Sequence, residues 1–462
     1  MRILTCSNSC PRWEDGKIFP RSPGGLVPMV IALLDQHGGD WIFTLPPDRP
    51  GTPDTVRVGS DVVLHPIEPG EDLRRQHYDE VSIRLILGLL HYLHDTSEQP
   101  VFDDRMWAAW AGYEEVNRLY AKRLAEVSGG GDDELVLLND PHLMLVPEFF
   151  AAERPGRRRL AYFLGTPWCE PDYFSLIPRP IRVRLLTSLL RCDVVGFHAS
   201  RWADAFLRCC ARELPGAVID GRTVHHAGHR TELVATPFPL DTGTIDTMVA
   251  EPPMEKWRGR LAQAARGRRI MLRADRLDLW KNLPRGFRAY EMLLERRPEL
   301  AAECWFAAVV TTPSRATGRH LAYAEATEEV VRRINERFAV EGTEAVSLVR
   351  PAADDDSRHC VLAGLGMSDA AVVNSTYDGL NLFAKEAAYV LPDNASLLIS
   401  ENAGVLENLS RFAVPVDPFD LAATSAAMEA ALTGPGTSSR EERRSMLRGE
   451  TVSGWLAEVF RL

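Results

Sequence analysis

Residues 270–284 read IMLRADRLDLWKNLP, an apolar β-rich run followed by a cationic loop and a helix start. The apolar run predicts a strand. Pro284 favours a helix that begins near Leu283, because the first turn of a helix tolerates proline. A strand followed by a loop and a helix is the unit from which parallel sheets with crossover helices are built. This stretch therefore predicts an α/β fold.

The same alternation of short apolar runs and longer helical patterns continues in both directions along the chain. In the first half we expect strands at Arg2–Cys6, Trp41–Phe43, Val62–Leu64, Leu135–Asn139, Leu160–Leu164, Val194–Phe197 and Leu233–Thr236, with helices at Leu26–His37 and Ile83–His94. In the second half we expect strands at Ile270–Arg273, Trp305–Val310, Val346–Val349, Ala371–Asn374, Leu397–Ser400 and Ala413–Val416, with helices from Leu283, Tyr323, Leu380 and Leu421.

The pattern breaks at Pro237-Phe238-Pro239, where proline disfavours regular structure and a polar stretch follows. We place a linker there and expect two doubly wound, Rossmann-like domains, residues 1–237 and 238–450, followed by an amphipathic helix at about 451–462. Residues 434–444 are expected to form an exposed polar connection. Doubly wound sheets bind ligands at the carboxyl ends of their strands, so two facing domains predict an interdomain cleft.

Composition excludes several classes of function. The 462 residues include 53 Lys and Arg against 64 Asp and Glu, a formal net charge of −11 that offers no field for nucleic acid. No apolar stretch approaches the ~18 residues of a membrane span. No two of the eight cysteines form a C-x-x-C pair. The first ten residues contain too few apolar residues to form the apolar region of a signal peptide. We expect a cytoplasmic protein with buried thiols and without membrane or nucleic-acid partners.

Two cations of the opening stretch, Arg276 and Lys281, suit a diphosphate. Arginine offers a planar fork of donors and lysine a compact charge. The chain has only five lysines, so a lysine in such a loop is less readily explained as an incidental surface residue. They are Lys17, Lys122, Lys256, Lys281 and Lys385. The alternative is a surface ion pair with Asp275 or Asp278.

Residues 374–386, NSTYDGLNLFAKE, repeat the order of strand, glycine turn and helix start. A helix start offers free amides and a positive dipole end to phosphate. A ligand on the amides of Leu382 and Phe383 would meet the carboxylate of Glu386 one turn further on, which suits the two hydroxyls of a ribose. Asp378 suits sugar hydroxyls, and its alternative role is to cap the helix.

Two further candidates carry weaker signals. Gly24-Gly25 precedes the helix at Leu26, where missing side chains allow backbone to approach a phosphate. Asp140 follows an apolar strand, and its alternative role is again to cap a helix, here one beginning near His142.

No metal site is expected. The acidic run Asp354-Asp355-Asp356 is read as a solvated connection, and His225-His226 with His229 as an exposed turn.

Together these segments resemble the trehalose-6-phosphate synthase family of retaining glycosyltransferases. The resemblance rests on Gly24-Gly25, Asp140-x-His142-Leu, Asp193-x-x-Gly196-Phe197, Arg276-Leu-Asp-x-x-Lys281, Pro313-Ser-Arg315 and Asp378-Gly-x-Asn-Leu-x-x-Lys-Glu386, in the family's order and spacing over nearly the whole chain. It implies the GT-B architecture of two facing Rossmann-like domains, with the last helix packed back on the first domain. It also implies metal-independent sugar transfer from a nucleotide diphosphate donor, without a cofactor.

The resemblance assigns roles residue by residue. Arg276 and Lys281 would hold the leaving diphosphate in catalysis, and Asp140 would position the acceptor. The donor would contact Gly24, Gly25, Arg276, Lys281, Asp378, Gly379, Leu380, Asn381, Leu382, Phe383 and Glu386, and the acceptor Asp140, Tyr78 and Arg315. In the family's proposed front-face mechanism no protein nucleophile attacks. The leaving phosphate takes the acceptor's proton while the cations stabilise its growing charge.

Three departures from the family pattern concern the substrates. Ser9 stands where the family has an arginine on the acceptor's phosphate, Gly165 where it has a histidine near the donor sugar's sixth carbon, and Thr44 where it has an acceptor-side tryptophan. Because polar pockets discriminate strongly against ligands that leave them unpaired, these changes predict an altered acceptor and leave the donor sugar open. Arg12 and Arg21 are candidates to replace the missing arginine.

Two alternatives accompany this interpretation. The validoxylamine-type pseudoglycosyltransferases, which form a C–N bond between a phosphorylated amino-cyclitol and an activated cyclitol in antibiotic biosynthesis, share the pattern of Asn374 to Leu382, but they keep the histidine replaced by Gly165. The other alternative is a non-catalytic protein that binds a nucleotide sugar. Retention of Arg276, Lys281, Asp378 and Glu386 argues against it.

Overall fold

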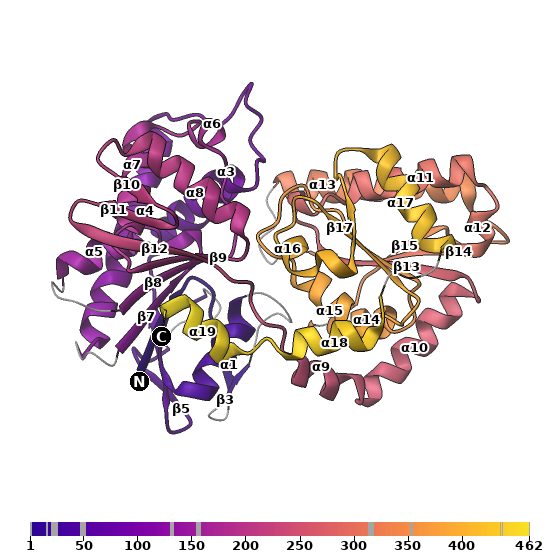
Figure 1. Ribbon diagram of the computed structural model, residues 1–462, viewed down its shortest axis with the longest axis horizontal. Coiled ribbons are helices and arrows are strands. Elements are labelled where there is room, and N and C mark those ends of the chain that lie inside the picture. Colours follow the sequence, from indigo (N-terminus) through magenta and orange to yellow (C-terminus); the bar gives the residue numbers. More distant parts are fainter. Residues whose placement is uncertain are drawn as a thin grey trace. The chain divides into compact units, whose positions relative to one another are not determined.

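The chain folds as two compact units, each with its own sheet and core (Figure 1). In this computed structural model the structure describes residues 2–14, 17–19, 26–46, 52–129, 134–153, 159–312, 318–351, 354–434, 436 and 438–461. The N-terminal unit comprises Met1–Phe238 and Val452–Leu462, and the C-terminal unit comprises Pro239–Thr451.

The N-terminal unit is built on a ten-stranded sheet in the order β10-β11-β12-β9-β8-β7-β1-β4-β6-β5. Its seven central strands are parallel, and β5, β10 and β11 add antiparallel edges. The strands are β1 Arg2–Ser7, β4 Gly39–Thr44, β5 Val56–Val58, β6 Val62–Ile67, β7 Glu134–Asn139, β8 Arg159–Leu164, β9 Val194–Phe197, β10 Val218–Asp220, β11 Thr223–His226 and β12 His229–Ala235. A separate hairpin joins β2 (Arg12–Glu14) to β3 (Lys17–Phe19).

Helices cover both faces of this sheet, so its central strands are buried and read as continuous apolar runs (Figure 1). They are α1 Leu26–His37, α2 Glu71–Arg74, the π-helix η1 Arg75–Leu87, α3 Gly88–Leu90, α4 Asp104–Val127, the 3₁₀-helix η2 Pro141–Leu143, α5 Val146–Glu153, α6 Pro171–Phe174, α7 Arg179–Leu189, α8 Ser200–Glu213 and α19 Val452–Phe460. Helix α19 contacts α1, β8 and β9, and its Trp455 ring lies edge-on to Phe163 and Phe238 at centroid distances of 4.9 and 5.1 Å.

The C-terminal unit holds a six-stranded, all-parallel sheet in the order β15-β14-β13-β16-β17-β18. Its strands are β13 Arg269–Arg276, β14 Cys304–Thr311, β15 Val346–Val349, β16 Ala370–Val373, β17 Ser396–Ser400 and β18 Val414–Val416. Helices α11, α13 and α17 cover one face of the sheet, and α10 and α14 pack together on the other (Figure 1). The bounds are α9 Thr242–Val249, α10 Pro252–Ala265, the 3₁₀-helix η3 Leu279–Lys281, α11 Leu283–Arg296, α12 Leu300–Glu303, α13 Gly318–Phe338, α14 Asp354–Leu365, α15 Leu382–Val390, α16 Val405–Leu409, the 3₁₀-helix η4 Ser410–Phe412, α17 Leu421–Thr433 and α18 Arg440–Arg448.

Two expectations about local structure are wrong. The helix expected at Ile83–His94 is instead the π-helix η1 followed by one short α-helical turn, which ends before Tyr92 with its φ of 56°. The stretch 434–444 is not wholly an exposed connection, because α18 begins inside it and buries Arg443. The Arg443 guanidinium donates to the carbonyl oxygens of Ala388 and Leu391 at the end of α15, which makes its burial favourable.

Two expectations drawn from composition can be compared with the structure. All eight cysteines are free and buried, as expected. Within the described ranges, no helix is both long and apolar enough to cross a bilayer.

Candidate active site

The predicted site residues lie where the strand order of each sheet reverses. In the C-terminal unit the chain starts at β13, moves outward through β14 and β15, and then returns to the other side of β13 with β16. In the N-terminal unit the corresponding reversal lies between β1 and β7. Loops leaving the carboxyl ends of strands diverge at such a point, and doubly wound sheets bind their ligands there.

The loop after β13 carries the two predicted cations, and their environments differ. Arg276 pairs with Asp278, its Nε and Nη2 lying 2.9 and 2.8 Å from Oδ2, while more than half of the Arg276 side chain is exposed. The alternative of an ion pair with a neighbouring acid is therefore present in the structure for Arg276. Asp278 itself is buried, with 6% of its side chain exposed, so only the Arg276 end of the pair is open to solvent and to an arriving phosphate.

Lys281 points instead to the loop after β16, where its Nζ lies 2.7 Å from Oδ2 of Asp378. The same carboxylate oxygen accepts from Nδ2 of Asn381 at 3.0 Å and from Oγ of Ser375 at 3.1 Å. Four residues from two segments far apart in the sequence thus converge on one point. The structure brings Lys281 and Asp378 together as neighbours.

Asp378 does not cap the following helix. Asn381 does so, with a φ of 82° and its Oδ1 accepting from the amide of Ala384 at 3.1 Å. The first-turn amides of α15, those of Leu382 and Phe383, have no intrahelical acceptor and lie at the positive end of the helix dipole. The Asp378 backbone pairs with the segment at Ala403 as a parallel bridge, which fixes the turn.

Glu386 lies one turn along α15 and forms an ion pair with Arg358 of α14, with Oε1 and Nη2 3.2 Å apart. Both side chains are only 13% exposed. Burial raises the pKa of Glu386, and the Arg358 guanidinium partly offsets this. The pair therefore favours a carboxylate that can accept hydrogen bonds from ligand hydroxyls.

In the N-terminal unit, Asp140 directly follows β7 with a φ of 67°, a conformation that side chains rarely adopt. Its carbonyl oxygen accepts from the hydroxyl of Tyr162, which holds this strained backbone. Burial raises the pKa of the Asp140 carboxyl to about 7. Its side chain makes no capping bond to η2, so the helix-cap alternative is not observed.

Tyr78 reaches the same region through His142. The Tyr78 and His142 rings stack at a centroid distance of 5.5 Å and an interplanar angle of 11°. Nε2 of His77 donates to the His142 carbonyl oxygen at 2.8 Å. Burial lowers the pKa of His77 to about 4 and that of His142 to about 3, so both rings are neutral at physiological pH.

One of the three departures, Gly165, lies beside Asp140, and another, Ser9, follows β1, the strand next to β7. A Cβ at Gly165 would sit 3.2 Å from Oδ1 of Asp140 and 3.7 Å from Nε2 of His198, so residue 165 adjoins the predicted acceptor-positioning carboxylate. Ser9 is exposed just after β1, its carbonyl oxygen accepting from Oγ of Ser7 at 2.7 Å. Thr44 is tied to Tyr120, with hydroxyl oxygens 2.7 Å apart, and serves the packing of β4.

Some predicted residues lie outside the described part of the chain. They are Gly24, Gly25 and Arg315, together with Arg21, one of the two candidate replacements for the missing arginine. The other candidate, Arg12, is exposed on β2.

Three residues that shape the C-terminal part of the site were not predicted from the sequence: Arg273, Asn282 and Arg358. Arg273 is buried inside β13 and donates to the Lys281 carbonyl oxygen at 2.8 Å. Asn282, with a φ of 59°, donates to the Asn374 carbonyl oxygen at 2.8 Å. An arginine inside an otherwise apolar strand was the signal for Arg273, whereas nothing in the local sequence singles out Arg358 as the partner of Glu386.

Within the described residues, no cluster of three or more His, Cys, Asp or Glu side chains is arranged to hold a metal. The acidic run at 354–356 opens α14 rather than forming a loop, and Asp356 accepts from Nε1 of Trp257 at 2.7 Å. His226 and His229 flank a β-hairpin turn between β11 and β12, consistent with the turn expected there.

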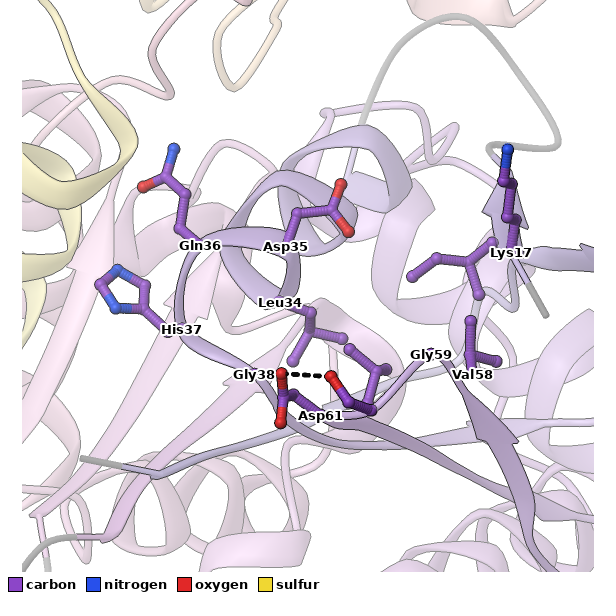
Figure 2. A pocket seen from close by; sticks show the side chains of 12 residues that line it. Lys17, Leu34, Asp35, Gln36, His37, Gly38, Val58, Gly59 and Asp61 are labelled. Atoms are coloured by element: carbon purple, nitrogen blue, oxygen red, sulfur yellow. Dashed lines mark hydrogen bonds between the residues drawn. The ribbon is translucent and has the colours of Figure 1, made fainter.

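A hollow of about 520 Å³ lies in the N-terminal unit away from the site (Figure 2). Its lining includes Lys17, Asp35, His37 and Asp61, and the carboxylate of Asp61 accepts from Ser60 at 2.6 Å. It adjoins Gly38 and Val62, at the amino ends of β4 and β6. Since Asp140 follows the carboxyl end of parallel β7, the hollow belongs to the opposite edge of the sheet.

Comparison with known proteins places this arrangement in a family. Residues 11–461 match the family model of glycosyltransferase family 20. The chain is 30% identical over 435 residues to an α,α-trehalose-phosphate synthase (UDP-forming) 2 of Aspergillus niger, covering 91% of this chain and 87% of that protein. It is also 30% identical over 450 residues to a validamine 7-phosphate valienyltransferase of Streptomyces hygroscopicus subsp. jinggangensis, covering 96% and 86%.

Among solved structures, an α,α-trehalose-phosphate synthase (UDP-forming) from Burkholderia xenovorans in complex with glucose-6-phosphate matches with a TM-score of 0.87 at 23% identity, over 100% of this chain and 99% of that one. This likeness bears out the α/β fold of the GT-B class. A family model that spans nearly the whole chain shows more than fold. The chain belongs to glycosyltransferase family 20 and is a glycosyltransferase.

Proposed function

We propose that this glycosyltransferase moves a sugar, with retention and without a metal, from a nucleotide diphosphate to a phosphorylated sugar or cyclitol. The observation that carries the proposal is the convergence of Lys281, Asp378 and the start of α15 at the switch point of the C-terminal sheet, with Arg276 on the same loop. The relatives include UDP-forming trehalose-phosphate synthases, which supports uracil as the base of the donor nucleotide.

In the proposed mechanism, Arg276, Lys281 and the first-turn amides of α15 bind the diphosphate. These donors are in place before the reaction, so they stabilise the charge that grows on the leaving phosphate as the glycosidic bond breaks. The leaving phosphate oxygen takes the proton of the acceptor's attacking group, and the new bond forms on the same face of the sugar. Glu386 accepts from the ribose hydroxyls, and Asp378 and Asn381 contact the donor sugar.

The acceptor is assigned to the residues around Asp140 and Tyr78. An acceptor hydroxyl or amine donates to the Asp140 carboxylate, which has no hydrogen-bond donor among the described side chains. Tyr78 offers a ring face already stacked on His142. Ser9 replaces the family's arginine on the acceptor's phosphate, so we propose an acceptor other than glucose 6-phosphate. Gly165, beside Asp140, replaces the family's histidine near the donor sugar, so the donor sugar stays open.

A second candidate is C–N bond formation between cyclitols. Two observations favour keeping it: the 30% identity to validamine 7-phosphate valienyltransferase, and the Asn374-Ser-Thr-x-Asp-Gly-x-Asn-Leu pattern. Asn374 has a defined place in the structure, with its Oδ1 accepting from Arg273 at 3.0 Å. A carboxylate such as Asp140 also suits an ammonium group on the acceptor.

One experiment separates the candidates. UDP release is followed in the presence of EDTA, with UDP-glucose or a UDP-activated cyclitol as donor and glucose 6-phosphate or a phosphorylated amino-cyclitol as acceptor. Products are identified by mass and, for the sugar donor, by the anomeric coupling constant in NMR. Metal-independent release with an α-configured product supports retaining transfer. UDP binding without turnover of any acceptor supports the non-catalytic alternative, and release only after metal is added contradicts the mechanism.

A further inference from the structure

We propose that Arg273 is a positioning residue that aims Lys281 at the diphosphate, an inference that rests on the proposed role of Lys281. Arg273 lies inside β13, three residues before the strand ends and eight before Lys281, and its side chain is 1% exposed. A guanidinium buried to this degree needs specific partners, because an unpaired buried charge is strongly unfavourable.

The partners of Arg273 lie on three segments that meet behind Lys281. Its Nη2 donates to the Lys281 carbonyl oxygen at 2.8 Å and to Oδ2 of Asp275 at 2.7 Å. Its Nε donates to the same Asp275 oxygen at 2.9 Å, and its Nη1 donates to Oδ1 of Asn374 at 3.0 Å. One planar group therefore fixes the β13 end, the Lys281 backbone and the β16 end relative to one another.

Asn374 and Asn282 extend this support to the residue after Lys281. Asn374 donates through Nδ2 to the Asn282 carbonyl oxygen at 3.2 Å, and Asn282 donates through its own Nδ2 to the Asn374 carbonyl oxygen at 2.8 Å. The chain is thus held at Lys281 and immediately after it, where Asn282 adopts its left-handed conformation. With the backbone fixed, only the side-chain torsions of Lys281 decide where its ammonium group points.

Helix α11 makes room for this guanidinium. A Cβ at Gly286 would lie 2.6 Å from Nη1 of Arg273 and 3.0 Å from Nδ2 of Asn374, closer than real contacts allow. Glycine is among the poorest helix formers, and the closeness of Arg273 is the steric reason for its place two residues after Pro284 in the first turn of α11. Helix α11 and the residue after β16 therefore both pack closely against the guanidinium that β13 carries.

The charge of Arg273 is balanced close by, so its effect on a ligand is positional. Asp275 faces both Arg273 and Lys281, and burial raises the pKa of Asp275 while these two cations oppose the rise. With Arg273 and Asp275 paired, the ammonium of Lys281 is left to act on Asp378 or on a phosphate. Loss of Arg273 is therefore expected to misplace Lys281 rather than to remove a phosphate ligand.

The test measures UDP affinity by calorimetry in wild type, Arg273→Met, Lys281→Ala and the double variant. We expect each single change to weaken UDP about 10-fold or more, and the double variant to bind no more weakly than Lys281→Ala, because coupled residues are non-additive. The control is Arg443→Met, which removes another guanidinium that is 1% exposed and bonded to backbone carbonyls, far from Lys281 in the fold. It should lower the melting temperature without changing UDP affinity. Additive losses in the double variant, or equal losses in Arg443→Met, would overturn the proposal.

Gly286→Ala is the second variant, in case Arg273→Met does not fold. It adds one carbon where the guanidinium lies and favours the helix, so it displaces Arg273 while every charge is kept. We expect weaker UDP binding that again disappears in the Lys281→Ala background. Unchanged UDP affinity in Gly286→Ala would count against the role of Arg273.

A readout without nucleotide separates this inference from the proposed function. The chain has five lysines, so reductive ¹³C-methylation gives few NMR signals, and Lys281→Arg identifies that of Lys281. We expect the Lys281 signal to move in Gly286→Ala or Arg273→Met and to stay in Arg443→Met. If wild type binds no UDP but the signal moves, Arg273 positions Lys281 and only the donor assignment fails. An unmoved signal contradicts the positioning itself.

Discussion

The ammonium nitrogen of Lys281 lies 2.7 Å from a carboxylate oxygen of Asp378, although the two residues are 97 positions apart in the chain. The ion pair joins the loops that leave β13 and β16 at the switch point of the C-terminal sheet. A phosphate bound at Lys281 competes with Asp378 for the same ammonium protons. Asp378 keeps Asn381 and Ser375 as donors and is then available to a sugar hydroxyl.

Arg276→Ala or Lys281→Ala should reduce turnover about 100-fold or more, the effect of losing one preorganised donor to developing charge. The measurement is kcat for UDP release with a working acceptor. Arg288→Ala is the matched control, since Arg288 is exposed on the same helix that follows this loop. Near-normal turnover in both site variants would remove the catalytic assignment.

Glu386→Ala should weaken UDP binding roughly 10-fold, because a hydrogen bond to a charged group contributes about 1.5–3 kcal/mol. The same change should weaken 2′-deoxy-UDP by a smaller factor, because that nucleotide lacks one of the two hydroxyls proposed to bind Glu386. Calorimetry with both nucleotides gives the comparison. If Glu386→Ala weakens the two equally, Glu386 supports the fold through Arg358 rather than binding the ribose.

The raised pKa of Asp140, about 7, makes stability depend on pH. Between about pH 4 and pH 7 the folded protein holds a proton on this carboxyl that the unfolded chain has lost, so its stabilising contribution is present at low pH and lost as pH rises. Relative to Asp140→Asn, the free energy of unfolding of wild type should be about 3 kcal/mol lower at pH 8 than at pH 5. The lowered pKa values of His77 and His142 add a pH dependence of the opposite sign, but both proteins share it and it cancels in the difference between them. Denaturant titrations at pH 5 and pH 8 measure these free energies of unfolding. The same difference between the two proteins at both pH values would contradict the burial of this carboxyl.

The same carboxyl should control the acceptor. Because hydroxyl and ammonium donors need the ionised form, kcat/KM for the acceptor should rise with pH through about 7 and then level off. Asp140→Asn should give a low, flat profile. A wild-type profile without a step near pH 7 would indicate that the acceptor is held elsewhere.

Ser9→Arg combined with Gly165→His should shift selectivity toward UDP-glucose and glucose 6-phosphate, roughly 10-fold or more in the ratio of kcat/KM values. The new side chain at 165 would begin 3.2 Å from Asp140, so the carboxylate must move by a few tenths of an ångström. Gly165→Ala is the control for that displacement alone. An unchanged ratio would show that specificity is set by other residues.

Helices and strands with a clear pattern of apolar residues were predictable from the sequence. Helix α1 and strands β9 and β15 have the bounds expected for them, because continuous apolar runs between polar turns allow few other placements. The linker was expected at Pro237–Pro239, and the two units divide between Phe238 and Pro239. The π-helix η1 was not predictable, since its hydrogen-bond pattern has no counterpart in the spacing of apolar residues.

The candidate site was partly predictable for the same reason. Doubly wound sheets bind their ligands at the carboxyl ends of the strands. Lys281 and Asp378 each follow such a strand, so both were predicted from the local sequence, and they form an ion pair in the structure. Arg273 and Arg358 were missed because each acts through a partner brought near only by the fold. Arg443 was expected at the surface for the same reason, because the carbonyl oxygens that bind it come near only in the folded chain.

The most direct test of the account is a calorimetric titration of wild type, Arg276→Ala and Lys281→Ala with UDP, GDP, ADP and dTDP in the presence of EDTA. The account predicts that wild type binds UDP in preference to the others without metal, and that either substitution weakens it at least 10-fold. Failure of every nucleotide to bind wild type, or equal binding by all three proteins, would contradict the diphosphate site on which the proposed transfer depends.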